Sequence, residues 1–571
     1  MRSGAEFFTN PLEPAQRRYE ALRRYLVEGL SAEAAGAPFG YSRATMYQMA
    51  AELRAGRGRF FCSAKPGPKG PRQTHTLRER VLAMRAQNHS VKEIADALTA
   101  EGTPISHQSV WVICSSEGLS RLPPRARRGQ GPAPRTEAVW AAPLDGWPAG
   151  ARWECAHAGA YLLLPAMVEA ALPEVIAAGG YPATSVLSAW HSMASLVLLK
   201  LLRVNRVSHA TELAADEALG LAVGLNVLPK ATHLTSYSYR VRRQMNTAAL
   251  TELVRRLRAG GLASGDAGFN LDFHSIRHYG QEAPLDNNYV PKRSQATRSV
   301  LAFFAQDHAS TEMVYANADV TKRESAKEVL AFAEHWRHTT GSDPGLLVFD
   351  SKLTTHAVLE ELSGRNISWL TLRQRREKTL AELAALPDSA WTPVNIERAG
   401  RYRHPHLYEQ EVAIKGISAP VRQIAVRNIG REEPTLLITN DAATRARDLF
   451  ARYAERMLVE NELAAYIAGF HVDALSSGLA LNVDLDTTLT VVAGSLYRLL
   501  ARSLKRYEQM TPERIWRHFV DTTGSVVVDE AGATVSLTRR TYTPVLLQAG
   551  FGELDVPVPW WGDRHLRFRF P

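Results

Sequence analysis

The sequence predicts a multidomain protein in which helical units precede a mixed α/β core. Its 571 residues exceed the roughly 250 residues at which a single hydrophobic core stops growing. The first 122 residues contain two helix-turn-helix patterns. From about Gly265 onward, short strand-like runs alternate with helical patterns.

The composition is that of an ordinary globular protein, with 45% hydrophobic and 22% charged residues. No apolar run reaches the roughly 18 residues that cross a bilayer, and no secretory signal is expected after the first arginine. The only cysteines, Cys62, Cys114 and Cys155, are far apart and are expected to be reduced thiols. These features predict a cytoplasmic, nucleoid-associated protein without a membrane partner.

The positive charge is concentrated near the N-terminus. Residues 1–140 contain 21 Lys and Arg against 12 Asp and Glu, a net charge of +9 out of +10 for the whole chain. A basic segment of this kind favours a polyanionic partner, because Lys and Arg that contact phosphates release counterions. A basic surface without a partner has the same charge, so charge alone does not decide between them.

The first unit, predicted over residues 1–60, is a helix-turn-helix. Apolar residues at helical spacing are followed by Ser31, which can cap a short helix, and by Ser42, which can cap a last helix. This arrangement places the last helix in the major groove of DNA. On that helix Ala44 and Met46 are expected to pack inward. The residues expected to face bases and phosphates are Ser42, Arg43, Tyr47 and Gln48.

The second unit, predicted over residues 76–122, repeats this plan. Ser90 and Glu93 have the spacing of a capping box, and Ser106 is placed to cap the last helix. The residues of that helix expected to face the groove are His107, Gln108 and Ser109. Either unit alone is typical of small helical bundles, but two in tandem within a basic region favour DNA binding.

Pro-rich and Gly-rich linkers separate these units from the rest of the chain. Residues 65–72 form either a spacer or a basic strap over phosphates, and residues 123–134 mark a domain boundary. A helical subdomain is predicted over residues 146–262, with a basic exposed face that is either structural or a DNA contact. The arginines of that face are Arg240, Arg242, Arg243, Arg255, Arg256 and Arg258.

Residues 265–510 predict an α/β catalytic core. Three strands, a helix, a strand, a helix and a strand follow one another, which is the order expected of an RNase H-like fold. A β-rich insertion is expected over about 379–440, and a long helix from Ala442 past Tyr466. Residues 511–571 predict a small β C-terminal tail with one hairpin.

Three acids lie where such a core would use them. Asp272 lies in the first strand, Asp350 follows the buried run 346–349, and Glu460 lies on the long helix. Catalytic groups collect at the carboxyl ends of strands in α/β sheets. Together the three carboxylates predict a catalytic site that holds two Mg²⁺ ions about 4 Å apart, a role that Mn²⁺ can also fill. Two such ions activate a water or 3′-hydroxyl and stabilise the leaving oxygen, so no side-chain nucleophile is required.

The helical acid has two neighbours on its own helix face. Tyr453, Arg456 and Glu460 are spaced by three and then four residues, which puts them on one side of a helix. A guanidinium one turn before a metal-binding carboxylate is well placed to hold a DNA phosphate. An ordinary ion pair on a solvated helix gives the same spacing.

This part of the sequence resembles a known family. The Tyr453-x2-Arg456-x3-Glu460 spacing, just after residues 436–440, resembles the YREK signature of cut-and-paste insertion-sequence transposases of the DDE class. Residues 348–362 resemble the second-aspartate block of that family, and residues 271–280 resemble the first. The likeness covers roughly residues 210–480.

The resemblance implies a DDE transposase that binds terminal inverted repeats, cuts at element ends and joins 3′-hydroxyls to target DNA. It also implies a homodimer that bridges two ends of double-stranded DNA. Two positions depart from the family pattern. Ile467 stands where the signature has a lysine, and the first block lacks the Asp-Gly-Thr form.

Two other functions remain open on the sequence. One is a transposase-derived DNA-binding regulator without catalysis, which the acidic triad disfavours and the absent lysine favours. The other is a structure-selective nuclease of the RNase H-like group, which the tandem helix-turn-helix units disfavour because they indicate recognition of a defined sequence.

Overall fold

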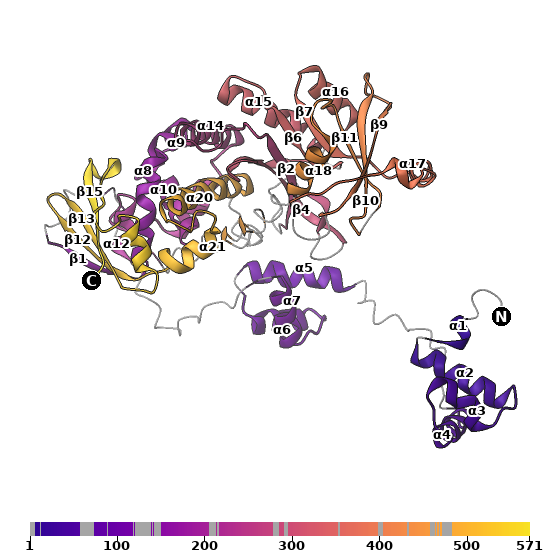
Figure 1. Cartoon of the computed structure of the whole chain (residues 1–571). Coiled ribbons are helices and arrows are strands. Elements are labelled where there is room, and N and C mark those ends of the chain that lie inside the picture. Colours follow the sequence, from indigo (N-terminus) through magenta and orange to yellow (C-terminus); the bar gives the residue numbers. More distant parts are fainter. Residues whose placement is uncertain are drawn as a thin grey trace. The chain divides into compact units, whose positions relative to one another are not determined.

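The protein is described from a computed structural model (Figure 1). The structure describes residues 6–11, 13–56, 73–87, 89–117, 119, 139, 141, 150–204, 213, 216–277, 285–290, 295–351, 355–397, 403–430, 433–456, 463, 465–466, 469–470 and 482–571. The predicted linkers 65–72 and 123–134, and Cys62, lie outside these residues. The chain divides into two units, residues 1–78 and residues 79–571, and each is treated by itself.

Among the described residues no single helix has the length and composition to cross a membrane. One bent pair of helical segments, Ala158–Glu169 and Leu172–Ala178, passes that test of length and composition.

The first unit has helices where the sequence predicted them. Its helices are α1 (Glu6–Thr9), α2 (Pro14–Leu26), α3 (Ala32–Gly36) and α4 (Arg43–Arg54). Both predicted caps are confirmed, because the Ser31 hydroxyl accepts the Ala34 amide and the Ser42 hydroxyl accepts the Thr45 amide. Met46 is fully buried as predicted, but Ala44 is exposed. Ala44 precedes Met46 by two residues and therefore lies on a different side of the helix.

A second three-helix group comprises α5 (Gln73–Ala86), α6 (Val91–Ala100) and α7 (His107–Ser116). The predicted capping box is confirmed: Ser90 accepts the Glu93 amide, and the Glu93 carboxylate accepts the Ser90 amide. The Ser106 hydroxyl accepts the Ser109 amide at the start of α7. Local sequence signals therefore set the starts of α6 and α7.

A helical layer surrounds one central helix, α20 (Val483–Ser503), which is buried along nearly its whole length. The helices around it are α8 (Leu164–Glu169), α9 (Leu172–Ala178), α10 (Ala189–Leu201), α12 (Glu217–Ala222), α13 (Ala231–Ser238) and α14 (Arg243–Ala259). A buried helix must satisfy its charged residues internally. Asp486 of α20 accordingly pairs with Lys200 of α10, with 2.8 Å between Oδ2 and Nζ.

Asp484, two residues before Asp486 at the start of α20, forms hydrogen bonds that link α20 to α14 and β5. Its carboxylate accepts hydrogen bonds from Arg243 (2.9 Å), from the Asn246 side chain (2.8 Å) and from the Ala318 backbone amide (2.9 Å). Arg243 was predicted on an exposed basic face, and that prediction is wrong. Its side chain is 16% exposed because it is turned inward to this buried acid.

The largest sheet carries the predicted core. Its strand order is β3-β4-β2-β6-β7-β11-β10-β9-β8, and β5 pairs with β4 next to β3, on the side away from β2. The core strands are β2 (Phe269–Arg277), β3 (Asp286–Val290), β4 (Gln295–Asp307), β5 (Met313–Val320), β6 (Leu346–Val348) and β7 (Ser368–Leu372). β2 is antiparallel to β4 and β4 to β5, whereas β6 runs parallel to β2 and to β7. Strand β3 was not predicted.

The predicted β-rich insertion continues this sheet instead of forming a separate one. Its strands are β8 (Thr392–Pro393), β9 (His406–Val412), β10 (Val421–Arg427) and β11 (Thr435–Thr439), preceded by helix α17 (Glu377–Ala384). β11 pairs antiparallel with β7, so the insertion is hydrogen-bonded directly to the core.

Helices cover both faces of the central strands. Successive residues of a strand point to opposite faces, and the core clusters follow that rule: Leu347 and Trp369 pack with α15 (Glu328–Thr340) and α16 (His356–Gly364). Val348 and Leu370 pack with α18 (Ala446–Glu455) on the other face. The all-apolar run before Asp350 is thus explained by burial on two sides.

The C-terminal residues form a second sheet of order β1-β12-β13-β15-β14. Its strands are β1 (Arg152–Cys155), β12 (Gly524–Asp529), β13 (Gly532–Leu537), β14 (Asp555–Val558) and β15 (Arg564–Arg569). The predicted hairpin is confirmed as β12 and β13. Strand β1, which comes from the start of the helical subdomain, pairs with β12.

Gly268 immediately precedes β2 and has a backbone conformation and surroundings that leave no room for a side chain. Its φ is +76°, and a Cβ there would lie 2.4 Å from the Leu346 carbonyl oxygen of β6. We expect Gly268→Ala to lower the free energy of unfolding by about 1–3 kcal/mol, because both the conformation and the space reject a side chain. Gly345→Ala is the matched control, since no atom lies within 4 Å of its added Cβ. Equal shifts in denaturation midpoint for both variants would contradict this account.

Candidate active site

Asp272 lies within β2, and Asp350 follows the neighbouring parallel strand β6. In the parallel pair β2 and β6, Asn270 is the partner of Val348. Asp272 and Asp350 each follow that last pair by two residues, so both lie just beyond its end. Asp272 and Asp350 therefore occupy corresponding positions relative to the paired residues of β2 and β6.

The Asp350 carboxylate has few partners. It accepts a hydrogen bond from the Ser351 hydroxyl (3.2 Å), and it forms no ion pair with any residue that the structure describes. A partly buried carboxylate without a cationic partner is suited to a metal ion, since hard cations take oxygen ligands.

Glu460, the third predicted acid, lies outside the described residues. Within the described part of the chain, no group of three or more His, Cys, Asp and Glu side chains could hold a metal ion. Ile467 also lies outside these residues.

The helix that leads toward Glu460 is α18. It was predicted to begin at Ala442, but it begins at Ala446. The Asp441 carboxylate accepts the amides of Ala443 (2.8 Å) and Thr444 (2.9 Å), which holds these residues in a turn before the helix. The structure describes the helix to Glu455 and its cap, Arg456.

Arg456 contacts Asp272 directly. Its Nη2 lies 3.2 Å from Asp272 Oδ1, and the two side chains are 8% and 18% exposed. The predicted guanidinium beside the acids is therefore present, and in this structure it is held by an acid. Tyr453 is half-buried and packs against the apolar residues under α18.

Arg452, which the sequence analysis did not single out, forms a second link between α18 and β2. Its Nη1 donates to Asn270 Oδ1 at 2.6 Å, and Asn270 is fully buried two residues before Asp272. The Asn270 amide donates to Gln306 of β4 (3.2 Å). His308 and Glu455 pair beside this network, with 3.1 Å between Nε2 and Oε2.

Burial perturbs the charged groups of this network. It lowers the pKa of Arg452 to about 10, although Glu455 and Asp307 oppose that change. The pKa of His308 is lowered first by burial and then by the Arg452 cation. Cations kept in a poorly solvated position beside two aspartates are typical of a functional site. Only tertiary structure reveals them, because Arg452 has no motif of its own.

The other predicted residues lie on the helix-turn-helix units. All are exposed, as a DNA-reading role requires. They are Ser42, Arg43, Tyr47 and Gln48 at the start of α4, and His107, Gln108 and Ser109 at the start of α7. His107 lies 3.7 Å from Asp96 of α6.

The Arg452 link predicts a positioning effect. On the sequence-based expectation of metal-dependent DNA cleavage, Arg452→Met should slow that reaction about 10-fold to 100-fold, the usual cost of losing an outer partner of a metal site. The Mg²⁺ concentration for half-maximal cleavage should rise, and Arg452→Lys should restore part of the loss. Arg447→Met is the control, because Arg447 is 53% exposed on the same helix. An unchanged Mg²⁺ requirement in Arg452→Met would leave Arg452 with a purely structural role.

Comparisons with known proteins give little further information. No family model matches the sequence, and no curated protein matches it. One similar solved structure is the cryo-EM structure of a piggyBac transposase synaptic complex with hairpin DNA. The two chains are 10% identical, with a TM-score of 0.32 over 58% of this chain and 69% of the other. A likeness this weak does not define a family.

Proposed function

We propose that the chain is a DNA transposase of the DDE class, which binds element ends, cuts DNA and joins 3′-hydroxyls to target DNA. The observation that carries the proposal is that Asp272, within β2, and Asp350, just after β6, each lie two residues beyond the last paired residues of these parallel strands. Helix α18 is anchored beside them through Arg452 and Arg456. That helix runs toward Glu460, the proposed third acid.

The strand order supports an RNase H-like core. Taken in chain order, β2, β4 and β5 are antiparallel neighbours, and β6 and β7 are added in parallel on the other side of β2. When β3 is set aside and these five strands are numbered in chain order, the order across the sheet is third, second, first, fourth, fifth. In the proposed core, the first and fourth strands carry the two aspartates.

The proposed cofactor is a pair of Mg²⁺ ions, for which Mn²⁺ can substitute, held by Asp272, Asp350 and Glu460. The donor set fits, because carboxylate oxygens are the ligands that Mg²⁺ takes and Asp350 has no cationic partner among the described residues. When bound, the ions supply an activated nucleophile and stabilise the leaving oxygen. Arg456 is positioned to move from Asp272 to a DNA phosphate once the charge of Asp272 is shared with a metal ion.

The DNA partner is supported by the helices at the N-terminus. Exposed polar residues occupy the first turns of α4 and α7, the part of a recognition helix that contacts base edges. We propose that these helices read the terminal inverted repeats. We also propose that a homodimer bridges two ends.

Incubation of the full chain with linear DNA that carries the element's ends tests the proposal. In the presence of Mg²⁺ the parent protein should cut at those ends, and Asp350→Asn should bind them without cutting. Inverted repeats that flank the coding sequence would supply the substrate. Binding by both proteins with no cutting by either would favour a transposase-derived regulator. Cutting of branched DNA without regard to ends would favour a structure-selective nuclease.

A further inference from the structure

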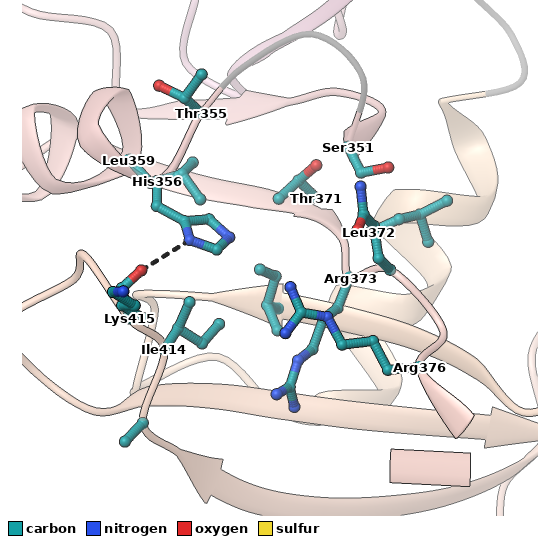
Figure 2. A pocket seen from close by; sticks show the side chains of 13 residues that line it. Ser351, Thr355, His356, Leu359, Thr371, Leu372, Arg373, Arg376, Ile414 and Lys415 are labelled. Atoms are coloured by element: carbon teal, nitrogen blue, oxygen red, sulfur yellow. Dashed lines mark hydrogen bonds between the residues drawn. The ribbon is translucent and has the colours of Figure 1, made fainter. Parts of the chain in front are cut away.

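A cavity of about 340 Å³ opens beside the proposed active site (Figure 2). Ser351, the residue after Asp350, lies at its edge. The walls come from the start of α16, the end of β7, the start of α17, and the turn between β9 and β10. The side chains that form them are Ser351, Thr355, His356, Leu359, Thr371, Leu372, Arg373, Gln374, Arg376, Ala413, Ile414, Lys415 and Ile438.

The cavity is strongly basic. Arg373, Arg376 and Lys415 line it, and no Asp or Glu occurs among the described residues of its walls. Figure 2 shows His356 facing the two arginines across the cavity. Burial lowers the pKa of Arg373, the Arg376 cation lowers it further, and Glu382 partly opposes this change. Cations that repel each other in a cavity of this kind are suited to an anionic ligand.

Two of these cations have no partner within the described chain. The side chains of Arg376 and Lys415 are exposed and form no hydrogen bond or ion pair with any residue that the structure describes. The Arg373 guanidinium, in contrast, donates to the Gln423 side chain. Arg376 and Lys415 therefore remain available to a ligand.

The backbone and the Thr371 hydroxyl can supply donors to the same cavity. Helices α16 and α17 both begin at its wall, and neither Thr355 nor Arg376 caps its helix through a side chain. Uncapped helix N-termini attract anions. His356 Nδ1 lies 2.9 Å from the Lys415 carbonyl oxygen, which can only accept, so Nδ1 donates. The Thr371 hydroxyl is buried without a hydrogen-bond partner among the described residues.

We infer that this cavity binds a backbone phosphate of the DNA strand on which the proposed enzyme acts. That the ligand is DNA rests on the proposed function. The basic character of the cavity does not depend on it. The volume exceeds that of a phosphate alone, and Leu359, Ile414 and Ile438 supply an apolar wall for the attached sugar. A phosphate held here would fix the strand beside Asp350.

The salt dependence of DNA binding tests the assignment without any requirement for cleavage. The affinity of the full chain for end DNA is measured over a range of salt concentrations, with Ca²⁺ in place of Mg²⁺. Arg376→Gln should lower the slope of log affinity against log salt by about 0.9, the value for one lost phosphate contact. The corresponding loss of affinity is about fivefold at about 0.15 M salt. Arg375→Gln is the control, because Arg375 donates to the Glu433 carbonyl (2.8 Å) and does not line the cavity.

Each outcome of these measurements either supports or overturns the phosphate assignment. A reduced slope in Arg376→Gln and Lys415→Gln but not in Arg375→Gln supports the assignment, even if the parent fails to cut DNA. An unchanged slope in both cavity variants overturns it, even if Asp350→Asn shows that the parent is a nuclease. Inorganic phosphate is the second probe. If it raises the Tm of the parent but not of Arg376→Gln while the slopes stay equal, the cavity takes a free anion and the DNA assignment fails.

Discussion

Replacement of Asp484 with alanine is expected to lower the free energy of unfolding by about 3–5 kcal/mol, the loss typical when one partner of a buried ion pair is removed. The Asp484 side chain is 5% exposed, and Arg243, its partner, is 16% exposed. Without the carboxylate the guanidinium keeps its charge in a poorly solvated position. The Ala318 amide would also lose its acceptor, which loosens β5 from α20.

Chemical denaturation of the full chain measures this effect through the shift in midpoint. Asp484→Asn should lose less than Asp484→Ala, because an amide oxygen can still accept from Arg243 and Ala318. Asp388→Ala is the exposed control: Asp388 is 92% exposed in its pair with Arg427, so a change below about 1 kcal/mol is expected. If Asp484→Ala shifted the midpoint no more than Asp388→Ala, the buried pair would not hold the helical layer to the sheet.

Asp272→Asn is expected to reduce the proposed Mg²⁺-dependent cleavage about 10³-fold. This is the upper end of the range for loss of one electrostatic stabiliser. The substitution removes the charge that the proposed metal pair requires and also the charge that faces Arg456 at 3.2 Å. An arginine that is 8% exposed would then lack this ionic partner, so a fall in stability should accompany the loss of cleavage.

Single-turnover cleavage and end binding should be measured together on Asp272→Asn. Binding should persist, because the reading helices α4 and α7 do not include this residue. Asp266→Asn provides the matched control, since Asp266 is an exposed acid six residues earlier. Cleavage at the parent rate by Asp272→Asn would remove Asp272 from the catalytic site.

Sequence predicted the features that depend on neighbouring residues. Ser42, Ser90 and Ser106 cap helices because their hydroxyls accept amides three residues onward, and that spacing is visible in the sequence. The strands around Asp272 and Asp350 were predicted for a similar reason, since burial on one or both faces leaves a regular apolar pattern.

Features that depend on distant residues were missed. Arg243 looked like a surface arginine, and only the approach of Asp484, 241 residues later, explains its burial. Arg452 acts on Asn270 across 182 residues. The pairing of β1 with β12 joins segments more than 360 residues apart, and no local spacing encodes such a contact.

The basic cavity, too, is built from residues that are distant in the sequence. Its arginines follow β7 in sequence, where a solvated loop and a DNA contact are equally consistent with the composition. Lys415 comes from the insertion and meets them only because β11 pairs with β7. The enclosing shape is therefore a property of the assembled sheet.

The continuous ladder from β7 to β9 has a mechanical consequence. Because β11 is hydrogen-bonded along β7, and β10 and β9 continue the same sheet, these strands cannot swing away as a hinged lid, and a force on them is transmitted to β7. Deletion of strands β8 to β11 would leave the backbone donors and acceptors of β7 unpaired at an exposed sheet edge. Such an edge recruits strands from other molecules, so the shortened protein should aggregate instead of yielding a smaller enzyme.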